Sequence, residues 1–303
     1  MRKLTFISAF IVFLVNATVA QQLPIYSQYM LNDFSMNPAI AGTQDYFNVK
    51  SDNRFQWIGI TDAPRTYILT FDGPITSQHV GIGTYIYTDI TGPTRRTGFT
   101  TAYSYHLKLN SDLTLSFGLA AGLTQFAIDG QSISLQETTD PALPNAFASA
   151  IVPDFGAGAY LYGANFYAGI AAPQIIPITA KLTNIADAQD MLVRHYYVTA
   201  GYNFDVGNNF SIDPCIVGNY VYPVPPQVDL GARVLYMQKV WVGAGYRTMD
   251  AVYAMIGYVY QKNLTLGFSY DYPVTTINQY SFGTTELYIG ITFNKSKASQ
   301  PSL

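Results

Sequence analysis

Residues 112–128 read DLTLSFGLAAGLTQFAI. Every second position from Leu113 to Leu123 is apolar, whereas the positions between them hold Thr, Ser, Gly and Ala. A period of two is typical of a β-strand, because successive side chains point to opposite faces. One face is strongly apolar and the other is small and weakly polar, a split typical of a wall between lipid and a crowded or wet lumen.

The same alternation recurs along most of the chain, for example in 195–205, 263–271 and 286–293. We predict strands near 45–56, 64–73, 78–88, 97–109, 112–128, 153–163, 165–172, 194–205, 209–221, 227–236, 239–247, 250–261, 263–272 and 284–294. That is about 14 strands, an even number as in single-chain bacterial barrels. The sequence therefore predicts an all-β fold, a transmembrane outer-membrane β-barrel of antiparallel strands over residues 45–294.

A soluble β-sandwich would also alternate, but its outer positions should carry Lys, Glu and Arg. Only 12% of the residues are charged, against roughly 25% in soluble domains. Tyrosines at the strand ends, such as Tyr103, Tyr105, Tyr258 and Tyr260, also suit an interfacial aromatic girdle. Two links are long, 130–150 and 173–192, and we expect both at the cell exterior, the second with a short helix near 185–191.

The N-terminus reads as an export signal. A basic start, Met1–Lys3, precedes an apolar run of about 12 residues, and small residues end at Ala20. The run is shorter than the roughly 20 residues of a membrane-spanning helix, so we predict a signal peptide over 1–20 and an outer-membrane location. Residues 21–44 read as an irregular N-terminal segment, either a plug or a partner contact, and 295–303 read as a C-terminal tail.

The composition argues against several kinds of function. A net charge of −3 offers no basic field for nucleic acid. The single Cys215 leaves no disulfide or cysteine metal cluster. His79, His106 and His195 have no second histidine or carboxylate at ligand spacing, and no nucleophile or phosphate-loop motif is present. We therefore predict no cofactor, no metal and no enzymatic activity.

Charged residues on the predicted inner faces are the first candidate site. Asp229 and Arg233 share one face of a strand, and Arg247, Asp271 and Glu286 lie near the polar ends of other strands. They predict a lumen charge network, which either satisfies itself or forms a selectivity ring or peptide-binding patch.

Aromatic and turn residues near the N-terminus are the second candidate site. Such a composition is typical of interface hot spots. The alternative is that these residues pack inside the barrel as a plug. The partner-binding candidates are Tyr26, Tyr29, Phe34, Asn37, Pro38 and Trp57.

A series of short motifs runs along the whole mature chain. They are YSQYM (26–30), NPA (37–39), RFQWIG (54–59), APRT (63–66), TGPT (91–94), AYSYHL (102–107), PDFG (153–156), RHYY (194–197), GYR (245–247) and GFSYDY (267–272). In this order they resemble the PorP/SprF family of the type IX secretion system. The resemblance implies an outer-membrane barrel that associates with periplasmic ring proteins and lipoproteins of that system. It also implies help in secreting or anchoring large surface adhesins through their C-terminal domains, and it brings no catalytic residues.

Two other functions stay open at this point. The small polar face is compatible with an outer-membrane porin or small-solute transporter, which would conduct ions. An outer-membrane lipase or protease would need a Ser–His–Asp set at a rim, with His106 or His195 as base, and no sequence motif favours it. In every case outer-membrane lipid is an expected partner.

Overall fold

The computed structural model describes residues 25–75, 79–130, 147–181, 189–191 and 193–293. The predicted signal peptide and the predicted C-terminal tail lie outside the described residues. No helix among the described residues is long and apolar enough to cross a membrane.

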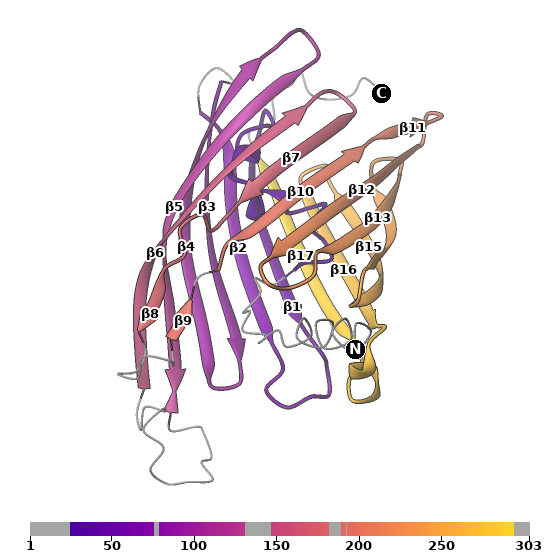
Figure 1. Ribbon diagram of the computed structural model, residues 1–303. Coiled ribbons are helices and arrows are strands. Elements are labelled where there is room, and N and C mark those ends of the chain that lie inside the picture. The colour runs from indigo at the N-terminus through magenta and orange to yellow at the C-terminus, as the bar shows by residue number, and fades with distance from the viewer. Residues whose placement is uncertain (1–24, 76–78, 131–146, 182–188, 192, 294–303) are drawn as a thin grey trace, which may run out of the picture.

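Antiparallel strands form a closed barrel (Figure 1). Its strands are β1 (Phe47–Phe55), β2 (Arg65–Ile75), β3 (Val80–Thr91), β4 (Thr94–Lys108), β5 (Thr114–Asp129), β6 (Phe147–Tyr162), β7 (Phe166–Ala172), β10 (His195–Tyr202), β12 (Phe210–Val221), β13 (Gln227–Tyr236), β14 (Val240–Arg247), β15 (Ala251–Tyr260), β16 (Leu264–Pro273) and β17 (Thr284–Phe293). Each strand pairs with its neighbours in sequence, β10 pairs with both β7 and β12, and β1 pairs with β17 to close the ring. The predicted all-β barrel of 14 strands is confirmed.

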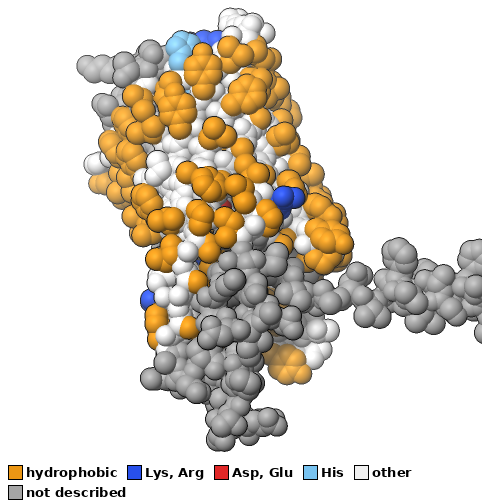
Figure 2. Space-filling view, turned by 60° about the vertical axis from the view of Figure 1, so that its left-hand side comes forward, with side chains coloured by type: hydrophobic (Ala, Val, Ile, Leu, Met, Phe, Trp, Pro, Cys, Tyr) orange, Lys and Arg blue, Asp and Glu red, His pale blue; other side chains and the backbone are white. Residues whose placement is uncertain are grey.

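The barrel is apolar outside and polar inside. In β4 the outward Phe99, Tyr103 and Tyr105 are about half exposed, whereas Ser104 and His106 are buried in the lumen. Figure 2 shows hydrophobic side chains spread over the barrel wall, with few charged ones among them. This inversion is the arrangement of a wall that faces hydrocarbon, and it explains why a chain with so little charge forms one large sheet.

The links divide into two ends. At one end, called the turn end, the links 76–79, 109–113, 163–165, 207–209, 237–239 and 261–263 are short, and β1 begins and β17 ends there. At the other, called the loop end, the links 56–64, 130–146, 173–194 and 274–283 are long, and the links 92–93, 222–226 and 248–250 are short. In outer-membrane barrels short turns face the periplasm and long loops the exterior.

A short strand, β11 (Phe204–Val206), continues the line of β10 and pairs with β12. Asn203 separates the two because its amide donates to Ser211 Oγ at 2.6 Å and also reaches Asp213. A side chain that bonds locally in this way competes with the strand ladder. We count β10 and β11 as one position of the barrel wall.

Two sequence predictions in this part of the chain need correction. Strand β6 begins at Phe147 rather than 153, and it passes through Pro153. The helix expected near 185–191 is wrong at its end, since Gln189–Met191 form strand β9, which pairs with β8 (Thr179–Lys181). Residues 185–188 lie outside the described residues.

Residues 25–46 lie inside the barrel (Figure 1). They contain two 3₁₀ turns, η1 (Asp33–Ser35) and η2 (Pro38–Ile40), and the β16–β17 link holds a third, η4 (Thr276–Gln279). Contacts of this segment run from the loop-end half of the lumen at Ser27 to the turn end, where β1 begins. We call residues 25–46 the plug segment.

Candidate functional site

The turn-end half of the plug segment sits against small residues of the wall. Turn η2 packs on β4, β5 and β6. A Cβ on Gly118 would stand 2.2 Å from the backbone nitrogen of Ala39, and one on Gly81 would stand 2.0 Å from the oxygen of Ala41. The small inward face of these strands therefore leaves the space that the plug segment occupies.

Polar groups of the wall bind the plug backbone in this half. Ser116 Oγ donates to the Ala39 carbonyl at 2.7 Å, and Ser104 Oγ donates to the Ala41 carbonyl at 2.6 Å. His106 Nε2 lies 3.0 Å from the same Ala41 oxygen. Bonds of this kind satisfy carbonyl groups that would otherwise be buried without a partner.

The loop-end half is bound by charge, centred on Ser27. Its hydroxyl donates to Asp271 Oδ2 at 2.6 Å and accepts from Arg54 at 3.1 Å and Arg247 at 2.9 Å. Its backbone nitrogen donates to Glu286 Oε2 at 2.9 Å, and the nitrogen of Gln28 donates to Oε1 of the same carboxylate at 2.7 Å.

The same charged side chains pair with one another. Arg54 binds Asp271 at 2.8 Å and Glu286 at 2.9 Å, and Arg247 binds Asp229 at 2.9 Å. All five are almost fully buried. We call Arg54, Asp229, Arg247, Asp271 and Glu286 the latch cluster, since together with Ser27 it joins β1, β13, β14, β16 and β17 to the plug segment.

Tyr29 extends this network deeper into the lumen. Its hydroxyl donates to Asp229 Oδ1 at 3.0 Å and lies 3.2 Å from Cys215 Sγ. Tyr253 donates to the same Asp229 oxygen at 2.5 Å. Burial raises the pKa of the Tyr29 hydroxyl far above its ordinary value, so the group stays a protonated donor.

The structure brings together four of the five charged candidates, namely Asp229, Arg247, Asp271 and Glu286. The fifth, Arg233, lies apart and pairs with Asp213 on β12 at 2.6 Å. Asp229 and Arg233 are four residues apart on β13 and so lie at different heights of the barrel.

The six partner-binding candidates also lie in two different places. Tyr26, Tyr29, Phe34, Asn37 and Pro38 are buried in the lumen as parts of the plug segment. Trp57 is half-buried at the loop end, in the β1–β2 link. A partner outside the barrel therefore has access to Trp57 and not to the other five.

Sequence reasoning missed Ser27, Arg54 and Asp52. Arg54 lies near the end of a predicted strand, and the alternation of that strand places its side chain on the inner face. The sequence could therefore have identified it. Ser27 carried no such signal, because the plug segment has no periodicity. Asp52 is fully buried in β1, two positions before Arg54, and its carboxylate lies near that of Glu286.

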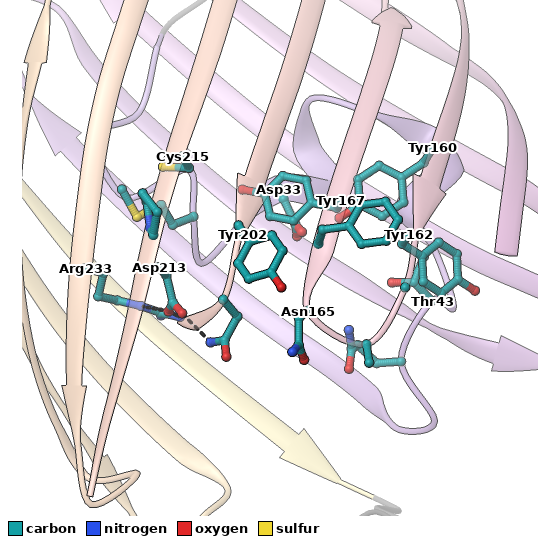
Figure 3. A pocket seen from close by; sticks show the side chains of 17 residues that line it. Asp33, Thr43, Tyr160, Tyr162, Asn165, Tyr167, Tyr202, Asp213, Cys215 and Arg233 are labelled. Atoms are coloured by element: carbon teal, nitrogen blue, oxygen red, sulfur yellow. Dashed lines mark hydrogen bonds and ion pairs between the residues drawn. The ribbon is translucent and has the colours of Figure 1, made fainter. Parts of the chain in front are cut away.

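A cavity of about 250 Å³ opens at the turn end, beside the plug segment (Figure 3). We call it the turn-end cavity. Its wall includes Tyr160, Tyr162 and Tyr167, its charged groups are Asp33, Asp213 and Arg233, and Asn165 stands among the turn residues that border it. Cys215 and Met30 also line it, so the plug segment closes it on the lumen side.

Among the described residues, no group of three or more His, Cys, Asp or Glu side chains is arranged to hold a metal ion. The latch cluster is an arrangement of ion pairs and hydrogen bonds around a peptide segment. Its chemistry is that of binding a polypeptide, with each carboxylate oriented by an arginine or a hydroxyl.

The barrel is similar to solved structures of outer-membrane proteins. The Ralstonia pickettii toluene transporter TbuX superposes with a TM-score of 0.51 at 12% identity, over 90% of this chain and 94% of that chain. The Acinetobacter baumannii outer membrane protein Omp33 gives a TM-score of 0.45 at 12% identity, over 83% and 99%. The likeness to TbuX supports the barrel fold and nothing finer. No curated protein matches the sequence.

The family model described as type IX secretion system membrane protein PorP/SprF matches residues 18–291. The match covers the plug segment and nearly the whole barrel, including all five residues of the latch cluster. The chain therefore belongs to the PorP/SprF family of type IX secretion system membrane proteins and is an outer-membrane β-barrel.

Proposed function

We propose that this protein is a sealed, non-enzymatic barrel that docks secretion partners and supports the secretion or surface anchoring of large adhesin-type cargo through a C-terminal domain. Membership of the family implies secretion-system partners. The single observation that carries the docking role is that the lumen is filled by the protein's own plug segment. A barrel whose interior is occupied leaves its rims and loops as the surfaces that other proteins can reach.

The loop end offers a surface suited to cargo. The β1–β2 and β16–β17 links are joined by backbone hydrogen bonds, from Ile58 N to Gly283 O at 2.8 Å and from Phe282 N to Ile58 O at 2.7 Å. We call residues 56–60 and 280–283 the loop-end lip. Phe282 packs on Gly59, where a Cβ would lie 2.8 Å from the ring.

Large apolar side chains of this lip are exposed. Tyr280 is 74% exposed, Phe282 77% and Ile58 40%. Trp57 is held beside them with a φ of 48°, a conformation that is strained for a bulky residue and that often marks functional positions. Rigid, exposed aromatics are the side chains that dominate binding energy at interfaces.

The test is affinity capture of the tagged barrel from its own outer membrane, followed by mass spectrometry. The native protein should recover a large adhesin together with type IX lipoproteins and periplasmic ring proteins. Replacing Tyr280 and Phe282 by Ala should lower adhesin recovery about tenfold, as for loss of a hot spot worth roughly 1.4 kcal/mol or more.

The matched control is Tyr222→Ala, because Tyr222 is also 74% exposed on a different loop-end link. Its recovery of adhesin should equal that of the native barrel. Purification of the native barrel without any partner in mild detergent would contradict the docking role. The alternative function would then be that of a porin or small-solute transporter.

A further inference from the structure

The turn-end cavity holds a carboxylate with spare acceptor capacity. Asp33 Oδ1 accepts from the nitrogen of Phe34 at 3.0 Å and from Lys50 Nζ at 3.5 Å. Within the described part of the chain, no hydrogen bond or ion pair holds Asp33 Oδ2. The side chain is 37% exposed, whereas that of Lys50 is 13% exposed. A charged oxygen in this setting favours a cation from outside the chain.

The other charges of the cavity do not supply that cation. Arg233 is committed to Asp213, with its Nε at 3.0 Å and its NH2 at 2.6 Å from Asp213 Oδ2. Among the described residues, Asp33 is thus the one charged lining residue whose partner, Lys50, lies at the long distance of 3.5 Å and outside the lining of the cavity.

A wall of tyrosines stands beside Asp33 (Figure 3). Tyr160 stacks on Tyr167 with ring centroids 5.7 Å apart, and Tyr162 adjoins Tyr160 at 5.6 Å. Tyrosine rings attract cations over their faces, and a guanidinium can stack on a ring while it also binds a carboxylate. A tyrosine wall next to an acceptor carboxylate thus selects arginine over other side chains.

The size and position of the cavity suit one large side chain. Its volume of about 250 Å³ corresponds to roughly eight waters at about 30 Å³ each. It is too small for a folded element, and it opens at the end that carries the short turns, which face the periplasm in outer-membrane barrels.

We propose that the turn-end cavity binds an arginine-bearing segment of a periplasmic secretion partner, with the guanidinium on the Tyr160–Tyr167 wall and against Asp33. The inference rests on the proposed docking function and adds the place and the chemistry of one contact. It assigns opposite ends of the barrel to cargo and to periplasmic partners.

The test is site-specific crosslinking in cells. A photoreactive phenylalanine replaces Asn165, at the border of the cavity, in the tagged full-length barrel. The crosslinked peptide should come from a periplasmic partner and contain arginine. Asp33→Asn in the same protein should lower the crosslink about tenfold, the scale of one lost charge-assisted contact, and Asp33→Glu should restore most of it.

The control is Asp62→Asn, which removes a carboxylate at the loop end and should leave the crosslink unchanged. A crosslinked segment without arginine, or a crosslink that Asp33→Asn leaves intact, overturns the proposal. So does absence of any crosslink from position 165 when affinity capture still recovers periplasmic partners, and in that case the docking function stands. Recovery of no partner at all overturns both.

Discussion

The hydroxyl of Ser27 lies 2.6 Å from Oδ2 of Asp271, although 244 residues separate the two in sequence. Because the same hydroxyl accepts from Arg54 and Arg247, one small side chain joins the start of the plug segment to both arginines of the latch cluster. The plug is therefore held at its loop-end half by a site whose parts come from both ends of the chain.

Ser27→Ala should loosen the plug segment without opening the barrel wall. The change removes one hydrogen-bond partner from two buried guanidinium groups and from a carboxylate. An unsatisfied buried group of this kind costs roughly 1–3 kcal/mol of stability. Hydrogen exchange of the amides of residues 26–31 should become faster, while that of strand amides in β4 and β5 should not change. Ser149→Ala, on the exposed face of β6, is the control. Equal protection of residues 26–31 in both variants would contradict the role given to Ser27.

Arg54→Met should destabilise the whole barrel. Without the arginine, the buried carboxylates of Asp271 and Glu286 lose a positively charged partner. Breaking a buried ion pair in this way lowers the free energy of unfolding by roughly 3–5 kcal/mol. The measurement is the urea midpoint in detergent micelles. Arg65→Met removes an exposed arginine at the loop end and should shift the midpoint little. Similar midpoints for the two variants would show that the latch cluster does not stabilise the fold.

Asp52→Asn should leave the stability unchanged or raise it, unlike most buried polar substitutions. The native carboxylate is fully buried beside the carboxylate of Glu286, and Arg54 and the Asn53 backbone compensate it only in part, so its charge is unfavourable there. Asp229→Asn is the matched comparison, since Asp229 accepts from Arg247, Tyr29 and Tyr253 and its loss should lower the urea midpoint. A lower midpoint for Asp52→Asn would mean that Asp52 has a stabilising partner.

Gly118→Ala should push the plug segment off the wall. The new Cβ would stand 2.2 Å from the Ala39 nitrogen, so the backbone of η2 has to move. In a Cys215→Ser background, a cysteine placed at Ala39 should react faster with a water-soluble maleimide. Gly218→Ala is the control, because its Cβ would meet nothing closer than 3.9 Å. No difference in labelling between the two would contradict the packing described for η2.

The strands could be predicted from the sequence because lipid on one side and a small polar lumen on the other impose a strict period of two. Strand β6 begins six residues before its predicted start and passes through Pro153. That strand pairs with β7 only over 157–162, so Pro153 lies where the missing donor is tolerated. The plug segment has no period at all, and its contacts are set by partners up to 259 residues away. Its lumen position therefore had to come from the structure, as did the pairing of Arg54 with Glu286.

The most direct test of the sealed barrel is single-channel recording in a planar bilayer. The native protein should show no steady ion conductance. A variant lacking residues 25–42, which keeps all strands and residues 43–46 before β1, should show stable open pores, because most of the plug segment has been removed. Steady conductance of the native protein at the level of the truncated one would contradict the account and return the protein to the class of solute channels.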